Sequence, residues 1–370
     1  MFKRIAAIQV LSSGAFLASF TYIAIYAREA GLTNFHITIM ASLYASATFF
    51  SAYIFGRLAD TYGKRKVLIV GLFSLIFITA SQALASNVFS FLSFRFLAGI
   101  GFGMFPAALA AYAFEAKAKM GRFSAFGALG WGLSLLFSGV VADRIGVWSV
   151  FVFASAMVGI ALFISMRLGR IPEIRIRSPL LPFKMFGKNF RILVPFIIRH
   201  STAASIWVLW PVFLHEKLGL NFWQIGIVQA TNALTQFLSM FLIGDHLKPR
   251  TLIGIGLIAS AMAFISFTII QEFPLFLVTQ VLLGFSWANL YVGSLRLMLE
   301  RNRERASAAG LLASSISLSS LIGPLISLVI VQLLPGSSYE GPMYLAFGAS
   351  LLAFLFFLSQ FKGLISVKPE

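Results

Sequence analysis

Gly56-Arg57-Leu58-Ala59-Asp60-Thr61-Tyr62-Gly63-Lys64-Arg65-Lys66 is the stretch of sequence from which the fold can be worked out. Long apolar runs flank it, at 37–55 and 67–86. A helix rises about 1.5 Å per residue, so each run is long enough to cross a bilayer. The stretch between them is short, and it therefore predicts an antiparallel membrane hairpin. The four cations of the stretch mark this end of the hairpin as cytoplasmic.

The composition indicates a helical membrane protein with many spans. Hydrophobic residues make up 59% of the 370 residues, charged residues 11%, and the mean hydropathy is +0.90. The net charge of +17 would suit a nucleic-acid partner, but the cations fall in short loops between apolar runs. They therefore indicate membrane topology and contact with anionic lipid, and no nucleic-acid partner is expected. Cysteine is absent, which excludes disulfides and thiolate chemistry.

Turn residues separate the apolar runs and predict twelve spans. The run that follows Lys3-Arg4 is too long for the core of a signal peptide, so we interpret it as the first span. The predicted spans are 5–27, 37–56, 67–86, 88–113, 123–142, 147–167, 190–214, 222–243, 251–270, 274–298, 306–334 and 342–361.

The distribution of lysine and arginine predicts the orientation. With the amino terminus inside, only Arg28, Arg144 and Lys217 fall in outer loops. Arg95, Arg199 and Arg296 fall inside spans, and the rest of the 29 lysines and arginines lie on the inner side. Because cytoplasmic loops are enriched in these residues, both termini are expected in the cytoplasm and the chain in the inner (plasma) membrane.

Internal similarity at about half the chain length predicts two related halves. The octet at 122–129 recurs at 305–312, and the pattern at 95–99 lines up with 280–284. A weaker counterpart of the opening stretch stands at 244–250. Three matches in register favour a duplicated six-span unit.

The predicted domains follow from this duplication. Residues 1–168 form an N-terminal six-helix bundle and residues 190–370 a C-terminal one. The basic segment 169–189 between them contains three prolines, which oppose one continuous helix, and is expected to be a cytoplasmic linker.

Several motifs resemble those of the major facilitator superfamily of transporters. The pattern G-x-L-A-D-x-x-G-[KR]-[KR] at 56–65 resembles the signature loop between the family's second and third helices. R-x-x-x-G-x-G at 95–101 resembles an element of its fourth span, and Glu115 followed by Gly121-Arg122 resembles its next inner loop. In the fifth span, 127–132 lacks the proline of the family's G-x-x-x-G-P, which counts against an antiporter.

The resemblance implies an all-α fold of two pseudo-symmetric six-helix bundles and a secondary active transporter that works by alternating access. It also implies that the opening stretch is a gating loop, with Gly56, Asp60, Gly63, Lys64 and Arg65 as its working residues. Physically, glycines allow helix ends to approach closely, and Asp60 can face a helix N-terminus or an inner-loop arginine. The alternative is that Asp60 merely offsets the basic charge around it.

Ionisable residues inside spans are candidates for binding the substrate or coupling its movement to an ion. Arg95 needs an acceptor, which either a substrate or neighbouring polar groups could supply. His200 titrates near neutral pH in water, so it is a candidate for proton coupling, with a buried structural histidine as the alternative.

Neutral polar and aromatic residues recur at helical spacing on four spans. Amides in lipid need partners, so these faces are expected to point inward, either toward a substrate or into ordinary interhelical hydrogen bonds. The substrate candidates among them are Gln9, Trp207, Asn232, Gln236, Gln280, Trp287 and Tyr291.

Other classes of function fit less well. A membrane-embedded enzyme would need clustered histidines or acids, and the four histidines form no helical pair. A channel fits two repeated halves less well than alternating access does. No catalytic residue, metal or cofactor is expected; the partners are a small-molecule substrate and membrane lipid, and the chain is expected to be a monomer. A multidrug or small-metabolite exporter is favoured slightly over a sugar or organic-anion permease.

Overall fold

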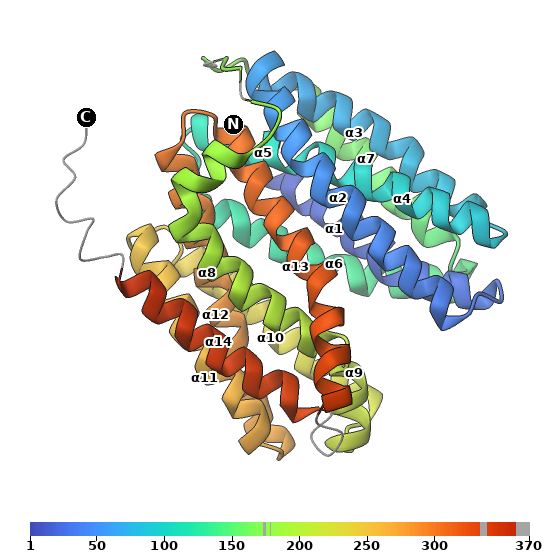
Figure 1. The fold of residues 1–370 in the computed structure, drawn as a ribbon. Coiled ribbons are helices and arrows are strands. Elements are labelled where there is room, and N and C mark those ends of the chain that lie inside the picture. The colour runs from blue at the N-terminus through green and yellow to red at the C-terminus, as the bar shows by residue number, and fades with distance from the viewer. Residues whose placement is uncertain (173–174, 178, 334–338, 360–370) are drawn as a thin grey trace. The chain divides into compact units, whose positions relative to one another are not determined.

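The computed structural model describes residues 1–172, 175–177, 179–333 and 339–359 (Figure 1). Throughout this part of the chain the regular structure is helical, and no strand occurs. Backbone groups in hydrocarbon have no water to bond, and a helix satisfies them within one segment. The predicted all-α fold is confirmed.

The helices follow one another with short connections. In chain order they are α1 (Phe2–Glu29), α2 (Asn34–Tyr62), α3 (Lys64–Ser81), a 3-10 turn (Gln82–Leu84), α4 (Val88–Met104), α5 (Pro106–Glu115), α6 (Met120–Ile145), α7 (Ser149–Met166), α8 (Phe183–Trp207), α9 (Trp210–Val212), a π-helical turn (Phe213–Lys217), α10 (Phe222–Leu242), α11 (Pro249–Ile269), α12 (Phe273–Arg301), α13 (Arg305–Leu333) and α14 (Glu340–Ser359).

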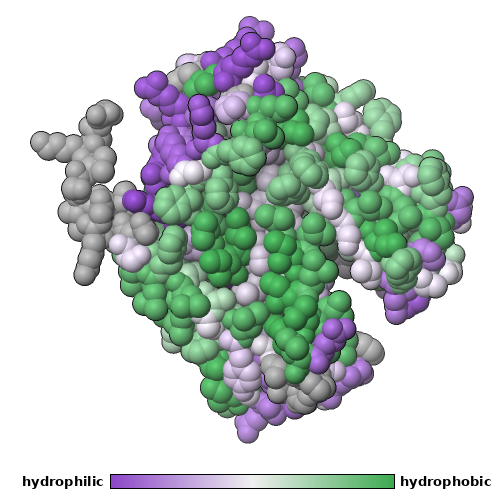
Figure 2. Space-filling view, viewed as in Figure 1, coloured by the Kyte–Doolittle hydropathy of each residue, from purple (hydrophilic) through white to green (hydrophobic). Residues whose placement is uncertain are grey.

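The number of helices able to cross a membrane agrees with the sequence, and Figure 2 shows hydrophobic residues over much of the visible surface. Among the described residues, eleven helices are long and apolar enough, with α4 and α5 counted as one. A twelfth is obtained when α8 and the following segment Trp210–Lys217 are taken together as one span.

Two of the spans predicted as continuous helices are interrupted. The seventh, predicted at 190–214, bends by 50° between α8 and Trp210–Lys217. Pro211 lacks an N–H and its ring clashes with the carbonyl four residues earlier, so the helix cannot continue straight. In the same way Pro106, the first residue of α5, interrupts the fourth predicted span after Phe105.

The chain divides into two compact units. Unit 1 contains Met1–Pro182 and Met298–Ser317, and unit 2 contains Phe183–Leu297 and Leu318–Glu370. Helix α13 therefore begins in unit 1 and continues into unit 2.

Small residues bring helices of unit 1 close together. Helix α1 packs against α6, and at their crossing Ser134 Oγ donates to the carbonyl oxygen of Gly14 at 2.6 Å. A Cβ at Gly130 would overlap the carbonyl oxygen of Val10. Close approach through small residues is how helices associate in a medium as apolar as their side chains.

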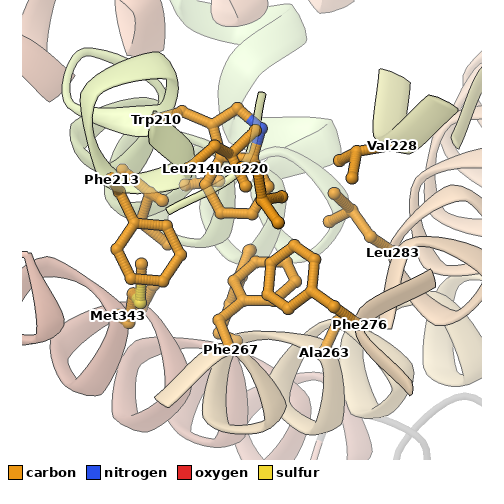
Figure 3. Packing of buried hydrophobic residues seen from close by; sticks show 14 residues of the cluster. Trp210, Phe213, Leu214, Leu220, Val228, Ala263, Phe267, Phe276, Leu283 and Met343 are labelled. Carbon is orange, nitrogen blue, oxygen red and sulfur yellow. The ribbon is translucent and has the colours of Figure 1, made fainter. Parts of the chain in front are cut away.

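Aromatic side chains fill the core of unit 2 around the bend in the seventh span. Figure 3 shows Trp210 and Phe213 meeting Phe267 of α11 and Phe276 of α12. The Trp210 ring lies 4.8 Å from that of Phe267 and 5.9 Å from that of Phe276. The bent segment is therefore anchored in a tightly packed core.

Gly130 and Gly132 provide a matched test of the α1–α6 crossing. Both lie in α6, but a Cβ at Gly132 would have no neighbour within 4 Å. We expect Gly130→Val to destabilise the protein by about 1–3 kcal/mol more than Gly132→Val, because only the first overlaps backbone. Thermal unfolding of both purified variants in detergent measures the difference. Equal melting temperatures would contradict the close crossing.

Candidate functional site

The turn between α2 and α3 is a single residue. Gly63 has a φ of 109°, a conformation that favours glycine, and its N–H donates to the carbonyl oxygen of Ala59 at 3.0 Å. The sequence predicted a longer basic turn. In the structure, residues 56–62 form the last turns of α2 and Lys64 begins α3, so the side chains of this stretch are held by helix geometry.

Asp60 caps the first turn of α13 within unit 1. Its Oδ1 accepts from the N–H of Ala306 at 3.1 Å, and its Oδ2 accepts from the N–H and the hydroxyl of Ser307 at 2.7 and 2.8 Å. The carboxylate is almost fully buried, with 1% of the residue exposed. A helix N-terminus carries unsatisfied N–H groups and partial positive charge, so a carboxylate is well placed there. Of the two partners considered from the sequence, the helix N-terminus is the one present.

Glycines let α2 and α13 approach closely enough for this contact. A Cβ at Gly56 would overlap the carbonyl oxygen of Ala306, and a Cβ at Gly310 would overlap that of Ala52. One helical turn further along α13, Ser314 Oγ donates to the carbonyl oxygen of Phe49 at 2.6 Å. The two helices are thus in backbone contact over several turns.

Lys64 extends the contact into a chain of alternating charges. Its Nζ lies 3.4 Å from Asp60 Oδ1 and 3.1 Å from Glu115 Oε1, and Glu115 Oε1 lies 3.3 Å from Arg305 Nη1. Lys64 is 1% exposed and Glu115 5%. Each carboxylate in the chain has a cation beside it, as buried charges require.

Sequence reasoning did not include Glu115, Arg305 and Ser307 among the site residues. A signal for each was present: Glu115 opens the motif that resembles the family's inner loop, and Arg305 and Ser307 belong to the octet that repeats at 122–129. That Asp60 would meet this particular helix could not be deduced, because backbone N–H groups leave no mark on the sequence.

Arg65, also predicted as a gating residue, makes a different contact. Its Nη2 donates to the carbonyl oxygen of Met166, the last residue of α7, at 2.6 Å. Arg65 therefore ties α3 to α7 within unit 1, beside the charge chain.

Arg95 is buried among aromatic rings of unit 1. Its guanidinium carbon lies 4.0 Å from the centroid of the Tyr44 ring and 5.2 Å from that of Phe20. Its Nη1 has no hydrogen-bond partner among the described residues. The ring faces supply part of the stabilisation that a counter-ion would give. Gln9 is separate: a Cβ at Gly127 would lie 2.7 Å from its Nε2, so its amide packs on that glycine.

In unit 2, three of the predicted residues form one aromatic stack. The His200 ring lies 4.8 Å from that of Trp287, and the Trp287 ring 5.6 Å from that of Tyr291, each pair at 23°. Arg199 is 1% exposed; it donates from Nε to Ser260 Oγ at 2.8 Å, and its guanidinium carbon lies 5.6 Å from the Trp287 centroid. The stack therefore has a buried cation beside it.

The other predicted residues of unit 2 make their contacts with residues outside this stack. Gln236 Nε2 donates to Asn232 Oδ1 at 2.6 Å on one face of α10, as their spacing predicts. Gln280 is buried and donates to Thr279 Oγ1 at 3.2 Å. Trp207 packs edge-on against Trp210 and against Phe264. Within the described residues, no group of three or more metal-ligating side chains occurs.

Substitutions at Lys64 and Lys66 compare a lysine of the buried charge chain with an exposed lysine nearby. Lys64→Met leaves two buried carboxylates without their shared cation, whereas Lys66 is exposed. We expect Lys64→Met to destabilise the protein by about 3 kcal/mol, at the lower end for a broken buried ion pair because Asp60 keeps its N–H donors. Lys66→Met should change stability by less than about 0.5 kcal/mol. Thermal unfolding in detergent distinguishes the two, and equal effects would contradict the charge chain.

Comparison with known proteins agrees with this architecture. The model of the Major Facilitator Superfamily matches residues 5–198 and 192–364. An uncharacterized MFS-type transporter of Methanocaldococcus jannaschii is 28% identical over 323 residues, covering 81% of this chain and 83% of the relative. The class E tetracycline resistance protein of Escherichia coli is 25% identical over 312 residues, covering 78% of this chain and 76% of the relative.

A solved structure shares the fold. The crystal structure of the human organic anion transporter MFSD10 superposes with a TM-score of 0.79 at 15% identity, covering 96% of this chain and 99% of that one. With the family model matching nearly the whole chain, and with multiple apolar spans in the structure, the chain belongs to the Major Facilitator Superfamily and is a multi-pass membrane transporter.

Proposed function

We propose that this transporter exports a small, flat, largely apolar solute by alternating access. The observation that carries the proposal is the Asp60 carboxylate bonded to the first turn of α13. The three hydrogen bonds to this one carboxylate can form and break together. A contact between interdigitated apolar side chains would instead have to separate at many points. We take this contact to be the one that forms in one state of the cycle and opens in the other.

The position of the contact suits such a role. Gly56, Asp60 and Lys64 sit at the end of the hairpin that carries the basic residues, which we place at the cytoplasmic surface together with both termini. Residues 1–168 and 190–370 would be the two bundles that move. Of the linker predicted at 169–189, residues 183–189 form the start of α8, and 173, 174 and 178 lie outside the described residues. The protein is accordingly a carrier and carries out no chemical step on its solute.

The aromatic side chains support a flat apolar solute. Unit 2 offers the partly exposed rings of His200, Trp287 and Tyr291, and unit 1 offers Phe20 beside Arg95. Such surfaces bind planar bodies by stacking. The direction of transport rests on the similarity to a tetracycline resistance protein.

Asp60→Asn tests the gating role. The amide keeps the shape but loses the charge, and charge-assisted hydrogen bonds are roughly twice as strong as neutral ones. We expect the export rate of a flat fluorescent dye from proteoliposomes to fall about tenfold per protein molecule, with insertion unchanged. Asp143→Asn is the control, since Asp143 is exposed at the end of α6. An unchanged rate in Asp60→Asn would overturn the gating role.

An organic-anion permease is the second candidate, favoured by the positive charges buried within the membrane spans. Arg95 and Arg199 are each buried within a unit, and the described acids lie at helix ends or in connections. Arg296, the third arginine predicted inside a span, instead donates to the carbonyl oxygens of Gly244 and Leu247 in the connection before α11. Neither arginine has an ion pair among the described residues, so each makes the electrostatic potential around it positive.

A series of ligands with one aromatic body and different charge distinguishes the candidates. Naphthoate, naphthamide and naphthylmethylammonium share a ring system and differ by one charge at each step. For an organic-anion permease, naphthoate should bind at least about tenfold more tightly than the amine, and Arg199→Met should remove the preference. For an exporter of apolar solutes, the three should bind within about threefold of one another. Thermal-shift titration of the purified protein gives the affinities.

A further inference from the structure

A narrow groove runs between α11 and α14 within unit 2. Its volume is about 260 Å³, and its lining residues are Arg250, Thr251, Gly254, Ile255, Ile258, Phe354, Phe357 and Leu358. All of these belong to the same two helices, which pack against each other. Large apolar side chains beside the groove are exposed, with Met262 of α11 at 55% and Leu355 of α14 at 59%. The groove therefore opens onto the surface that meets the hydrocarbon of the membrane.

The shape of the groove suits a chain of methylene groups. Gly254 leaves its floor open, since a Cβ there would meet only Phe354 Cε2, at 3.8 Å. Ile255, Ile258 and Phe357 complete apolar walls. At about 260 Å³ it is smaller than the roughly 300–1,000 Å³ pockets that enclose drug-sized ligands, which argues against a transport site.

One end of the groove carries positive charge. Arg250 and Thr251 line it there, in the first turn of α11, and Lys248 is the N-cap residue of that helix. The side chain of Lys248 makes no capping hydrogen bond, and the first turn of α11 contains no acidic residue. A guanidinium, an ammonium and a hydroxyl are donors that a phosphate diester accepts from.

The charged end lies where a lipid headgroup would be. Helix α11 begins and α14 ends there, so the apolar part of the groove extends from a helix terminus into the span. Helix α8 also packs against α14, with the Phe190 ring 6.4 Å from that of Phe356, and its first turns add Lys184, Lys188 and Arg191 to this end of unit 2. The first turns of α8 contain no acidic residue, and the connection before α11 contains one, Asp245.

We infer that the groove between α11 and α14 binds one anionic phospholipid, such as phosphatidylglycerol. One acyl chain lies along Gly254, Ile258 and Phe357, and the phosphate is held by Lys248, Arg250 and the start of α11. Apolar length alone would accept any phospholipid, whereas basic residues at the membrane surface select an anionic headgroup. The inference does not depend on which solute the protein transports.

Native mass spectrometry of the detergent-purified protein, titrated with phosphatidylglycerol or phosphatidylcholine of matched chains, tests the site. The wild type should bind phosphatidylglycerol roughly thirtyfold more tightly, since each Lys or Arg near an anionic headgroup contributes about a fivefold factor. Arg250→Gln combined with Lys248→Gln should reduce this preference to less than about threefold. Arg303→Gln, which removes an exposed cation elsewhere, should leave it unchanged.

Filling the groove tests the acyl chain separately. Gly254→Leu should weaken the binding of both lipids at the tight site at least about tenfold. Gly348→Leu is the control, because Gly348 lies in α14 outside the groove and a Cβ there meets nothing within 4 Å. Melting temperatures in lipid-free detergent show whether each variant is folded.

Three results of these lipid titrations would overturn the inference. They are equal affinity of the wild type for the two lipids, a preference that survives the double substitution, and tight binding that survives Gly254→Leu. Competition by millimolar inorganic phosphate that fully displaces the lipid would also overturn it, since it would reveal a simple anion site without a contribution from the chain.

Discussion

The buried carboxylate of Asp60 at the N-terminus of α13 is the interaction on which unit 1 depends. The charge chain beside it brings together one terminus of each of three helices. They are the end of α2, which carries Asp60, the start of α3 at Lys64, and the end of α5 at Glu115. The Asp60 contact also explains why α13 is shared. The first turns of that helix are held by bonds to unit 1, while its remainder packs with unit 2. Asp60 therefore bonds to a helix whose residues are divided between the two units.

Much of this architecture could be predicted because bilayer thickness imposes it. Apolar runs give the spans, and the glycines and cations around Asp60 give the hairpin and its family. Contacts distant in sequence could not be predicted: Asp60 and Ala306 are 246 positions apart, and the acceptor meets backbone N–H. Pro106 and Pro211, which interrupt their helices, are visible in the sequence. Hydropathy alone does not register them, because an interrupted helix is as apolar as a continuous one.

Aromatic rings and hydroxyls replace carboxylates around the cations inside the two units. Arg95 lies over Tyr44, and Arg199 lies near Trp287 and donates to Ser260. Ring faces and hydroxyl oxygens stabilise a guanidinium without cancelling its charge. The helix interiors therefore stay positive, and the acids are kept for helix ends, where they cap and pair. Buried charge in this protein thus occurs in two settings: Asp60 and Lys64 pair and hold helices together, whereas Arg95 and Arg199 lie among aromatic rings and hydroxyls.

The single-residue turn at Gly63 limits how this protein can evolve. Adding one residue to an α-helix rotates everything beyond it by about 100° and shifts it by about 1.5 Å. An insertion between Asp60 and Gly63, in the last turn of α2, would therefore turn Lys64 and the start of α3 away from Asp60, and the single-residue turn leaves no loop to absorb the shift. Descendants of this sequence can exchange side chains along the hairpin, but they cannot change its length. The spacing from Asp60 to Lys64 should therefore persist in lineages whose other loops have grown or shrunk.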